Sequence, residues 1–191
     1  MEEGVISRKE ALARVADVDL AAARTSRFAE PAEPVAKAVI ASPGVACGHA
    51  CFTSERAKDV AARGEPAILI RHDTSTEDVA GFAVAQGILT AVGGRTGHAA
   101  VVARQMGKVC LVGCRALAIA ERQDTATLDG RPIRDGDWIA LDGATGEISL
   151  GRRAVVAEET PETMTIWRWR EEAATAVQPN GSIATAMMQS H

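Results

Sequence analysis

Hydrophobic and polar positions change their spacing several times along this chain, and each change predicts a different element. The stretch PAILIRH has no polar alternation, which predicts a buried strand. AVIASPGVACGHACFTS predicts two short strands separated by a Ser-Pro-Gly turn at residues 42–44, and GILTAV and KVCLVG predict two more. Between the strands, ERAKDVAARG, TSTEDVAGFAVAQ and HAAVVARQMG have helical spacing, and Gly64 ends the first of them. Together these strands and helices predict an α/β fold with a mixed sheet and short helices.

The two ends of the chain differ from the middle. Ser7 with Glu10 three residues later is typical of a helix start, and Pro31 and Pro34 break the chain after it, so residues 1–37 are predicted as a helix and linker. Residues 38–151 are predicted as the main domain. Its last part has hairpin character, with turns at Asp129-Gly130, Asp135-Gly136 and residues 143–146. Residues 152–191 are predicted as a helical and polar tail.

The composition argues against two kinds of partner, membranes and nucleic acids. No apolar run approaches the roughly 20 residues that cross a bilayer, and the charged start has no signal-peptide character, so we expect a cytoplasmic protein without a membrane partner. The formal net charge is −4, only 3% of the residues are aromatic, and there is no Tyr. A nucleic-acid binder normally has a basic surface and stacking aromatic side chains, so we expect no nucleic-acid partner.

The four cysteines form two pairs with C-x3-C spacing, Cys47/Cys51 and Cys110/Cys114. A zinc site is one interpretation, and buried apolar thiols are the other. Both pairs fall in strand-like segments, where four residues span about 13 Å, too far for two ligands of one metal ion. We therefore expect core thiols and no metal.

The candidate catalytic residue lies in the segment GILTAVGGRTGHAAVVARQMG, whose pattern predicts a strand, a glycine loop and a helix. Gly93 and Gly94 permit a tight loop at the strand end, and the helix is expected to begin near Thr96, with His98 in its first turn. A helix N-terminus presents unpaired N–H groups and partial positive charge, which favour a bound phosphate and disfavour a protonated ring. The alternative interpretation is a structural histidine. Ala99, Val102 and Met106 are expected to form the core stripe of this helix.

GGRTGHAAVVAR resembles the active-site signature of the phosphoenolpyruvate-utilising enzymes, Gly-Gly-x-Thr-Ser/Cys-His-Ala-Ala with a trailing Ala-Arg. The resemblance is widest with the pyruvate phosphate dikinase branch. There ASPGVACGHACFTSERA, DTSTEDVAGF, KVCLVGC, DGRPIRDGDWIALDGATGEISLG and the opening MEEGVISRKEALARV also have counterparts, so it covers about residues 1–151. It implies a swivelling β/β/α phosphohistidine domain over residues 38–151.

The resemblance also implies roles for individual residues. His98 corresponds to the histidine that takes and gives up a phosphoryl group. Thr96 corresponds to a threonine that a regulatory kinase phosphorylates in some dikinases, and its alternative role is to cap the helix. Gly93, Gly94, Arg95 and Gly97 correspond to the phosphate loop, where Gly97 replaces the usual Ser or Cys. Arg104 is a candidate phosphate contact, and no residue is expected to bind a metal.

The complete dikinase has an ATP-grasp nucleotide-binding domain and a barrel that binds phosphoenolpyruvate or pyruvate, and these 191 residues have room for neither. The resemblance therefore implies an incomplete phosphotransferase, whose partner domains lie on other chains or in a larger parent protein. It implies that magnesium and ATP serve the complete enzyme and that this domain binds no cofactor itself. Two alternatives stay open: a binding or regulatory module without phosphotransfer, and a small hydrolase that uses His98.

Overall fold

The computed structural model describes residues 6–17, 25–120 and 125–176. The chain divides into two compact units, one formed by Ser26–Glu158 and the other by Met1–Thr25 with Glu159–His191. The boundaries of the larger unit differ from the predicted 38 and 151, because short strands on both sides extend it. We describe each unit by itself.

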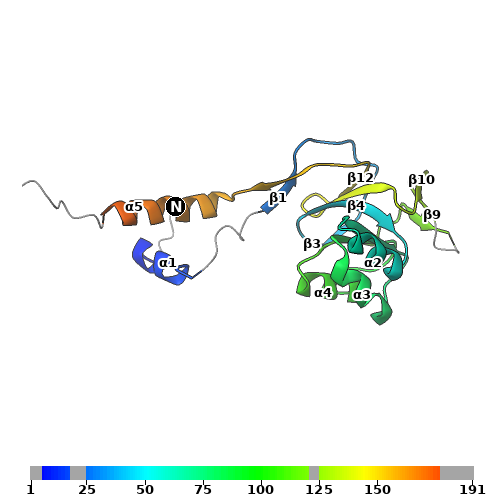
Figure 1. The fold of residues 1–191 in the computed structure, drawn as a ribbon, viewed down its shortest axis with the longest axis horizontal. Coiled ribbons are helices and arrows are strands. Elements are labelled where there is room, and N and C mark those ends of the chain that lie inside the picture. Colours follow the sequence, from blue (N-terminus) through cyan, green and yellow to red (C-terminus); the bar gives the residue numbers. More distant parts are fainter. Residues whose placement is uncertain (1–5, 18–24, 121–124, 177–191) are drawn as a thin grey trace, which may run out of the picture. The chain divides into compact units, whose positions relative to one another are not determined.

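The centre of the larger unit is a mixed eight-stranded sheet (Figure 1). Its middle strands β4, β5, β6 and β7 are parallel neighbours, and the flanking pairs are antiparallel. The order across the sheet is β2 (Ala36–Lys37), β12 (Glu147–Leu150), β11 (Trp138–Asp142), β4 (Val45–Cys51), β5 (Ala67–Arg71), β6 (Gly87–Thr90), β7 (Val109–Val112) and β3 (Val39–Ser42). The predicted mixed α/β class is confirmed.

Parallel neighbours need crossovers, and short helices supply them. They are α2 (Ser54–Ala62), the 3-10 turn η1 (Thr76–Asp78) with α3 (Val79–Val84), and α4 (His98–Gln105). These helices lie together on one side of the sheet (Figure 1). The core between helices and sheet is made of small and medium side chains around one large side chain, Phe82. Its fully buried members include Ala57, Val60, Leu69, Phe82, Ile88, Ala100, Ala103 and Cys110.

The core-facing stripe of α4 differs from the predicted one. Ala99, Ala100 and Ala103 are buried, whereas Val102 is half-buried and Met106 is 37% exposed. The physical reason is the length of the helix: it ends at Gln105, so Met106 lies beyond it and does not continue the stripe.

The opposite face of the sheet is covered by a three-stranded antiparallel sheet of β8 (Leu117–Ile119), β9 (Thr125–Leu128) and β10 (Arg131–Arg134). Leu117, Leu128 and Ile133 pack with the inward side chains of the large sheet in a second core. Asp129 and Gly130 both have positive φ, 50° and 75°, which is the geometry of a tight two-residue hairpin turn. The predicted hairpin at Asp129-Gly130 is thus confirmed.

The turn at Asp135-Gly136 does not make a hairpin, although the sequence pattern gave it hairpin character. β10 pairs with β9, and β11 pairs with β4 and β12, so this turn carries the chain from one sheet to the other. The turn at residues 143–146 does connect the paired strands β11 and β12.

The predicted N-terminal linker contains strands. β1 (Thr25–Phe28) pairs with β13 (Val155–Glu158) in a two-stranded sheet. In the smaller unit, α1 (Arg8–Arg14) has Ser7 as its N-cap, whose hydroxyl accepts the Glu10 N–H at 3.2 Å, as predicted. α5 (Pro161–Ala176) lies beside α1, with Arg8 paired to Glu172. Within the described residues, none of the helices combines the length and apolar character that crossing a bilayer requires.

Candidate functional site

The loop that precedes His98 leaves the sheet at a fixed point. The N–H groups of Ala91 and Val92 donate to the Arg71 and His72 carbonyls at 3.1 and 3.0 Å, which extends the pairing of β6 with β5 beyond Thr90. On the other side, the Cys114 N–H donates to the Thr90 carbonyl at 2.9 Å. The chain that leads to His98 is therefore held by both neighbouring strands.

Two glycines allow this loop to turn beside the end of β7. Gly93 has a φ of 107°, a conformation that L side chains rarely adopt. A Cβ at Gly113 would lie 2.9 Å from the Gly93 carbonyl oxygen, so only glycine permits this close approach of the two loops. The Gly97 N–H then donates to the Gly94 carbonyl at 3.0 Å and closes the last turn before α4.

His98 is the first residue of α4, and its side chain is exposed. The N-cap is Gly97, with φ −68° and ψ 166°, and no side chain caps the helix. The expected cap by Thr96 is therefore wrong, because the helix begins two residues after Thr96, which lies exposed in the turn. No side chain caps the first N–H groups of α4, at the end of the helix where His98 lies, and such a helix N-terminus favours an anion.

The structure brings only part of the predicted site together. Gly93, Gly94, Arg95 and Gly97 all lie in the loop before His98, and Arg95 is exposed. Arg104 lies at the other end of α4, about 9 Å along the axis from His98 by the rise of about 1.5 Å per residue. Its guanidinium donates to the Ala41 carbonyl at 2.8 Å, which fastens α4 to β3. The structure therefore does not bring Arg104 to His98.

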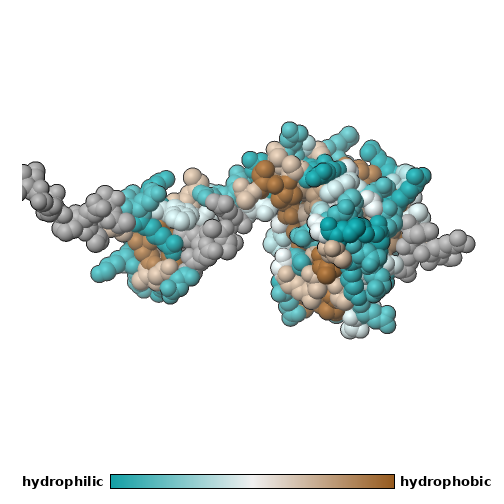
Figure 2. Space-filling model, viewed as in Figure 1, coloured by the Kyte–Doolittle hydropathy of each residue, from teal (hydrophilic) through white to brown (hydrophobic). Residues whose placement is uncertain are grey.

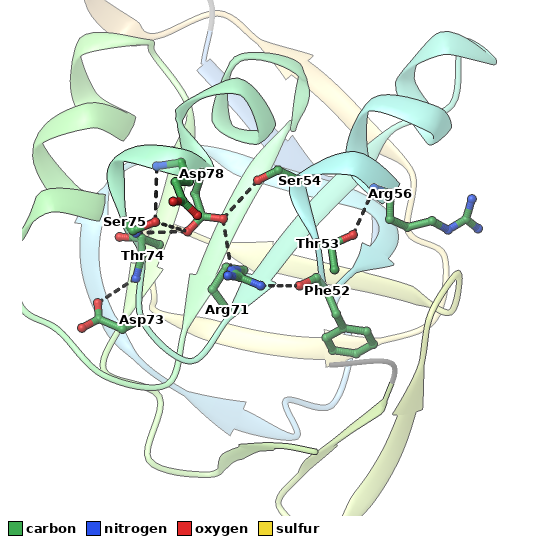
Figure 3. A network of polar contacts seen from close by, with 10 residues as sticks. Phe52, Thr53, Ser54, Arg56, Arg71, Asp73, Thr74, Ser75 and Asp78 are labelled. Atoms are coloured by element: carbon green, nitrogen blue, oxygen red, sulfur yellow. Dashed lines mark hydrogen bonds and ion pairs between the residues drawn. The ribbon is translucent and has the colours of Figure 1, made fainter. Parts of the chain in front are cut away.

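Behind the loop, a buried carboxylate joins three elements (Figure 3). Asp78 is 4% exposed and faces Arg71, whose Nε lies 3.2 Å from its Oδ1. The Ser54 hydroxyl donates to the same oxygen at 3.1 Å, and the Ser75 N–H donates to Oδ2 at 3.0 Å. Arg71 also donates to the Phe52 carbonyl at 2.8 Å. The network fixes the end of β5, whose carbonyls hold the loop before His98.

A cleft of about 230 Å³ opens at the carboxyl ends of β4 and β5. The sequence interpretation missed it, although the parallel strands and the polar run after PAILIRH were a usable signal, since such ends gather at one edge of a sheet. Its lining comes from these strand ends and from β8: Phe52, Ile70, Arg71, His72, Asp73, Ile119 and Ala120.

The four cysteines are buried free thiols. Burial raises the pKa of Cys51 and Cys110 to about 12, and it also raises the pKa of Cys47 and Cys114. Thiols of this kind stay protonated and are poor nucleophiles and metal ligands. Among the residues that the structure describes, no three His, Cys, Asp or Glu side chains gather as a metal site would require.

Comparison with known proteins shows what the segment around His98 is similar to. Residues 63–146 match the family model of the PEP-utilising enzyme, mobile domain. Over 85 residues, 42% of this chain, the sequence is 39% identical to the chloroplastic pyruvate, phosphate dikinase of Flaveria trinervia and 43% identical to the dikinase of Clostridium symbiosum. These matches cover 9% and 10% of the two dikinases, so the chain spans a small part of each relative.

Residues 63–146 are thus similar to the mobile domain of the PEP-utilising enzyme family, as the glycine–histidine signature predicted. Within that family, the similarity over the matched segment is to pyruvate, phosphate dikinases. Among solved structures, the chain is similar to an NMR structure of an Enzyme I protein, with 21% identity over 58% of this chain and 38% of that one. The TM-score of that comparison is 0.33, which supports no conclusion about function.

Proposed function

We propose that this chain is a phosphoryl carrier in which His98 is transiently phosphorylated. The observation that carries the proposal is the position of His98: it is exposed, it begins α4, and it follows a glycine loop held by two strands. An exposed ring is reachable by a donor and then by an acceptor, and the helix N-terminus favours the added negative charge.

The transfer step needs one unprotonated ring nitrogen. Its lone pair forms an N–P bond with the donor phosphorus while the P–O bond of the donor breaks, and the leaving oxygen keeps the electron pair of that bond. With phosphoenolpyruvate as donor, the leaving group is the enolate of pyruvate, which takes a proton from water. The second ring nitrogen keeps its proton or releases it to water. Positioning and charge stabilisation are the main catalytic terms in such a transfer, so a carrier needs few side chains.

The carrier works with partners. The matched dikinases are about ten times longer than the shared segment, and the sequence resemblance assigns them an ATP-grasp domain and a phosphoenolpyruvate- or pyruvate-binding barrel. We propose that equivalent domains, on other chains or in a larger parent protein, hold ATP, magnesium and the three-carbon substrate. The same proposal places the reaction in the cytoplasm.

A second candidate function is a binding or regulatory module that has lost transfer. Gly97 favours it, because the related enzymes carry Ser or Cys there. A Cβ at this position would lie 3.2 Å from the Gly94 oxygen, so a small side chain fits after a slight adjustment of the turn. Gly97→Ser therefore tests whether the missing side chain limits phosphorylation.

The deciding experiment incubates the chain with two donors. One is ³²P-labelled phosphoramidate, a small donor that needs no protein partner, and the other is labelled phosphoenolpyruvate with the Clostridium symbiosum dikinase. A carrier acquires an acid-labile, base-stable label that His98→Asn abolishes, whereas His49→Asn and His72→Asn retain it. If neither donor labels His98 in the unchanged chain or in Gly97→Ser, the module is the correct function.

A further inference from the structure

A buried hydroxyl lies at the base of the loop that leads to His98. It belongs to Thr90, the last residue of β6, whose side chain is 1% exposed. The transfer step gives Thr90 no role. On the face of the larger unit that Figure 2 shows, hydrophobic residues are scattered among hydrophilic ones, so surface hydropathy does not distinguish this region. The hydrogen bonds inside the loop do.

The Thr90 hydroxyl donates a hydrogen bond to the Val92 carbonyl, with 2.6 Å between the two oxygens. That distance is at the short end of the usual range for a hydroxyl donor. The Thr90 backbone is itself held on both sides. Its carbonyl accepts the Cys114 N–H at 2.9 Å, and Thr90 lies opposite Arg71 where β6 pairs with β5. The hydroxyl therefore connects the Val92 carbonyl to the sheet.

The Val92 carbonyl belongs to the same planar peptide group as the Gly93 N–H. Rotation of this group changes ψ of Val92 and φ of Gly93 together, so a hydrogen bond to its oxygen restricts both angles. The φ of Gly93 is 107°, and glycine adopts positive φ about as readily as negative φ. Gly93 therefore permits the observed orientation of the peptide group without selecting it. The Thr90 hydroxyl supplies the selection.

The orientation of this peptide group matters for the start of α4. The far end of the helix is fastened to β3 by the hydrogen bond from Arg104 to the Ala41 carbonyl. Its first turn follows directly on the loop, because Gly97 is the N-cap and its N–H donates to the Gly94 carbonyl at 3.0 Å. A changed direction of the chain at Gly93 is thus transmitted to the end of α4 where His98 lies.

The geometry points to Thr90 as a positioning residue for His98. Its hydroxyl holds the peptide group between Val92 and Gly93 in the orientation that leads the chain into the first turn of α4. The inference deepens the proposed carrier function and rests on it. Thr90 takes no part in the bond changes of the transfer. It keeps the attacking ring in one place, and the rate of such a step depends steeply on the position of the reacting atoms.

The test uses three variants of the full chain. Thr90→Val removes the donor and keeps the size and the β-branched shape of the side chain. Thr90→Ser keeps the hydroxyl and should rescue the function. Ser149→Ala is the matched control: it removes a hydroxyl that is also buried in the large sheet, in β12, but that has no hydrogen-bond partner among the described residues.

Labelling of His98 at increasing phosphoramidate concentrations gives a maximal rate and a half-saturating concentration. We expect Thr90→Val to lower the maximal rate at least about fivefold. The half-saturating concentration should stay within about twofold, because the small donor still reaches the exposed ring. Thr90→Ser and Ser149→Ala should keep the maximal rate within about twofold of the unchanged chain.

Nuclear magnetic resonance reports on the loop directly. In ¹H–¹⁵N spectra the Gly93 amide should give one signal in the unchanged chain, in Thr90→Ser and in Ser149→Ala. Thr90→Val should shift, broaden or double that signal, because its peptide group is no longer held at the Val92 oxygen. This readout distinguishes a change of the loop from a general loss of stability, which urea unfolding of the same variants measures.

A folded Thr90→Val chain that is labelled at the unchanged rate overturns the positioning role. The same holds if Thr90→Ser is as slow as Thr90→Val, or if Ser149→Ala is equally slow, because the loss then does not come from the hydrogen bond. If Thr90→Val does not fold, Thr90→Cys takes its place under the same criteria, since a thiol is a weak donor. Absence of label from both the unchanged chain and Gly97→Ser refutes the carrier function instead, and the Gly93 signal then still decides whether Thr90 holds the loop.

Discussion

Replacement of Asp78 by Asn should destabilise the larger unit far more than its conservative shape suggests. In the structure both carboxylate oxygens accept hydrogen bonds, and Oδ1 also faces the Arg71 guanidinium at 3.2 Å. An amide offers one accepting oxygen and one donating nitrogen. Whichever way it is oriented, either the Ser75 N–H or the Ser54 and Arg71 donors lose their acceptor.

The size of the expected loss in the free energy of unfolding follows from the burial of Asp78. Breaking a buried ion pair by removing one partner costs about 3–5 kcal/mol. The Arg71 side chain is 21% exposed, so water screens part of the remaining charge, and we expect a loss of about 2–3 kcal/mol in the free energy of unfolding. For a domain of this size that corresponds to a fall in Tm of roughly 10 °C. Asp59→Asn, on the exposed side of α2, is the control and should change stability by less than about 0.5 kcal/mol.

The assay is urea unfolding of a double-mutant cycle made of Asp78→Asn, Arg71→Met and the double variant. Groups in direct contact should show a coupling free energy of at least about 1 kcal/mol, because the second change removes a charge that the first left unpaired. This reasoning is refuted if the free energy of unfolding of Asp78→Asn lies within about 0.5 kcal/mol of that of the unchanged chain. Additive effects of the two substitutions in the cycle refute it as well. Labelling of His98 well below the melting temperature should persist, since neither residue contacts the ring.

Three further predictions follow from burial and position. His98→Ala should abolish labelling yet cost no more than about 1 kcal/mol in a thermal melt, because the exposed ring contributes little packing; a large fall in Tm would contradict this. Ala103→Asp should unfold the domain, because a carboxylate would enter a fully buried position. Val102→Asp places the carboxylate at a half-buried position and should lower the free energy of unfolding clearly less. Circular dichroism distinguishes these outcomes. Because burial raises the pKa of the Cys110 thiol to about 12, the folded state keeps a proton that the unfolded state loses near pH 9. Stability to urea should therefore fall between about pH 9 and pH 12, and Cys110→Ala should make that fall shallower.

Local patterns predicted the parts of this fold whose causes are local. The unbroken apolar run of β5, the glycine after α2, the Ser7 cap and the Asp129-Gly130 hairpin each depend on neighbours within a few residues. The glycine–histidine loop was visible for the same reason, since a strand, two glycines and a helical segment follow one another directly.

The features that the sequence did not predict depend on residues far apart in the chain. β1 and β13 are four residues long and exist because they pair with each other across more than a hundred positions. Asp78 stands at the start of the helical segment TSTEDVAGFAVAQ and forms a capping box with Ser75, which is a local feature, but its partners Arg71 and Ser54 come from other elements. The position of the α4 cap depended on the turn between Gly94 and Gly97, which no spacing rule resolves to one residue.

The strand order also determines when this domain becomes complete during synthesis. β4 to β7, with β3 beside β7, can pair as soon as residue 112 has emerged, but the other edge of β4 waits for β11, where His49 lies opposite Trp138. Until then a growing chain presents an unpaired strand and one open apolar face, the state most prone to aggregation. Slow translation or truncation before residue 150 should therefore harm solubility more than any truncation of the tail, because β12 has then not yet paired with β11.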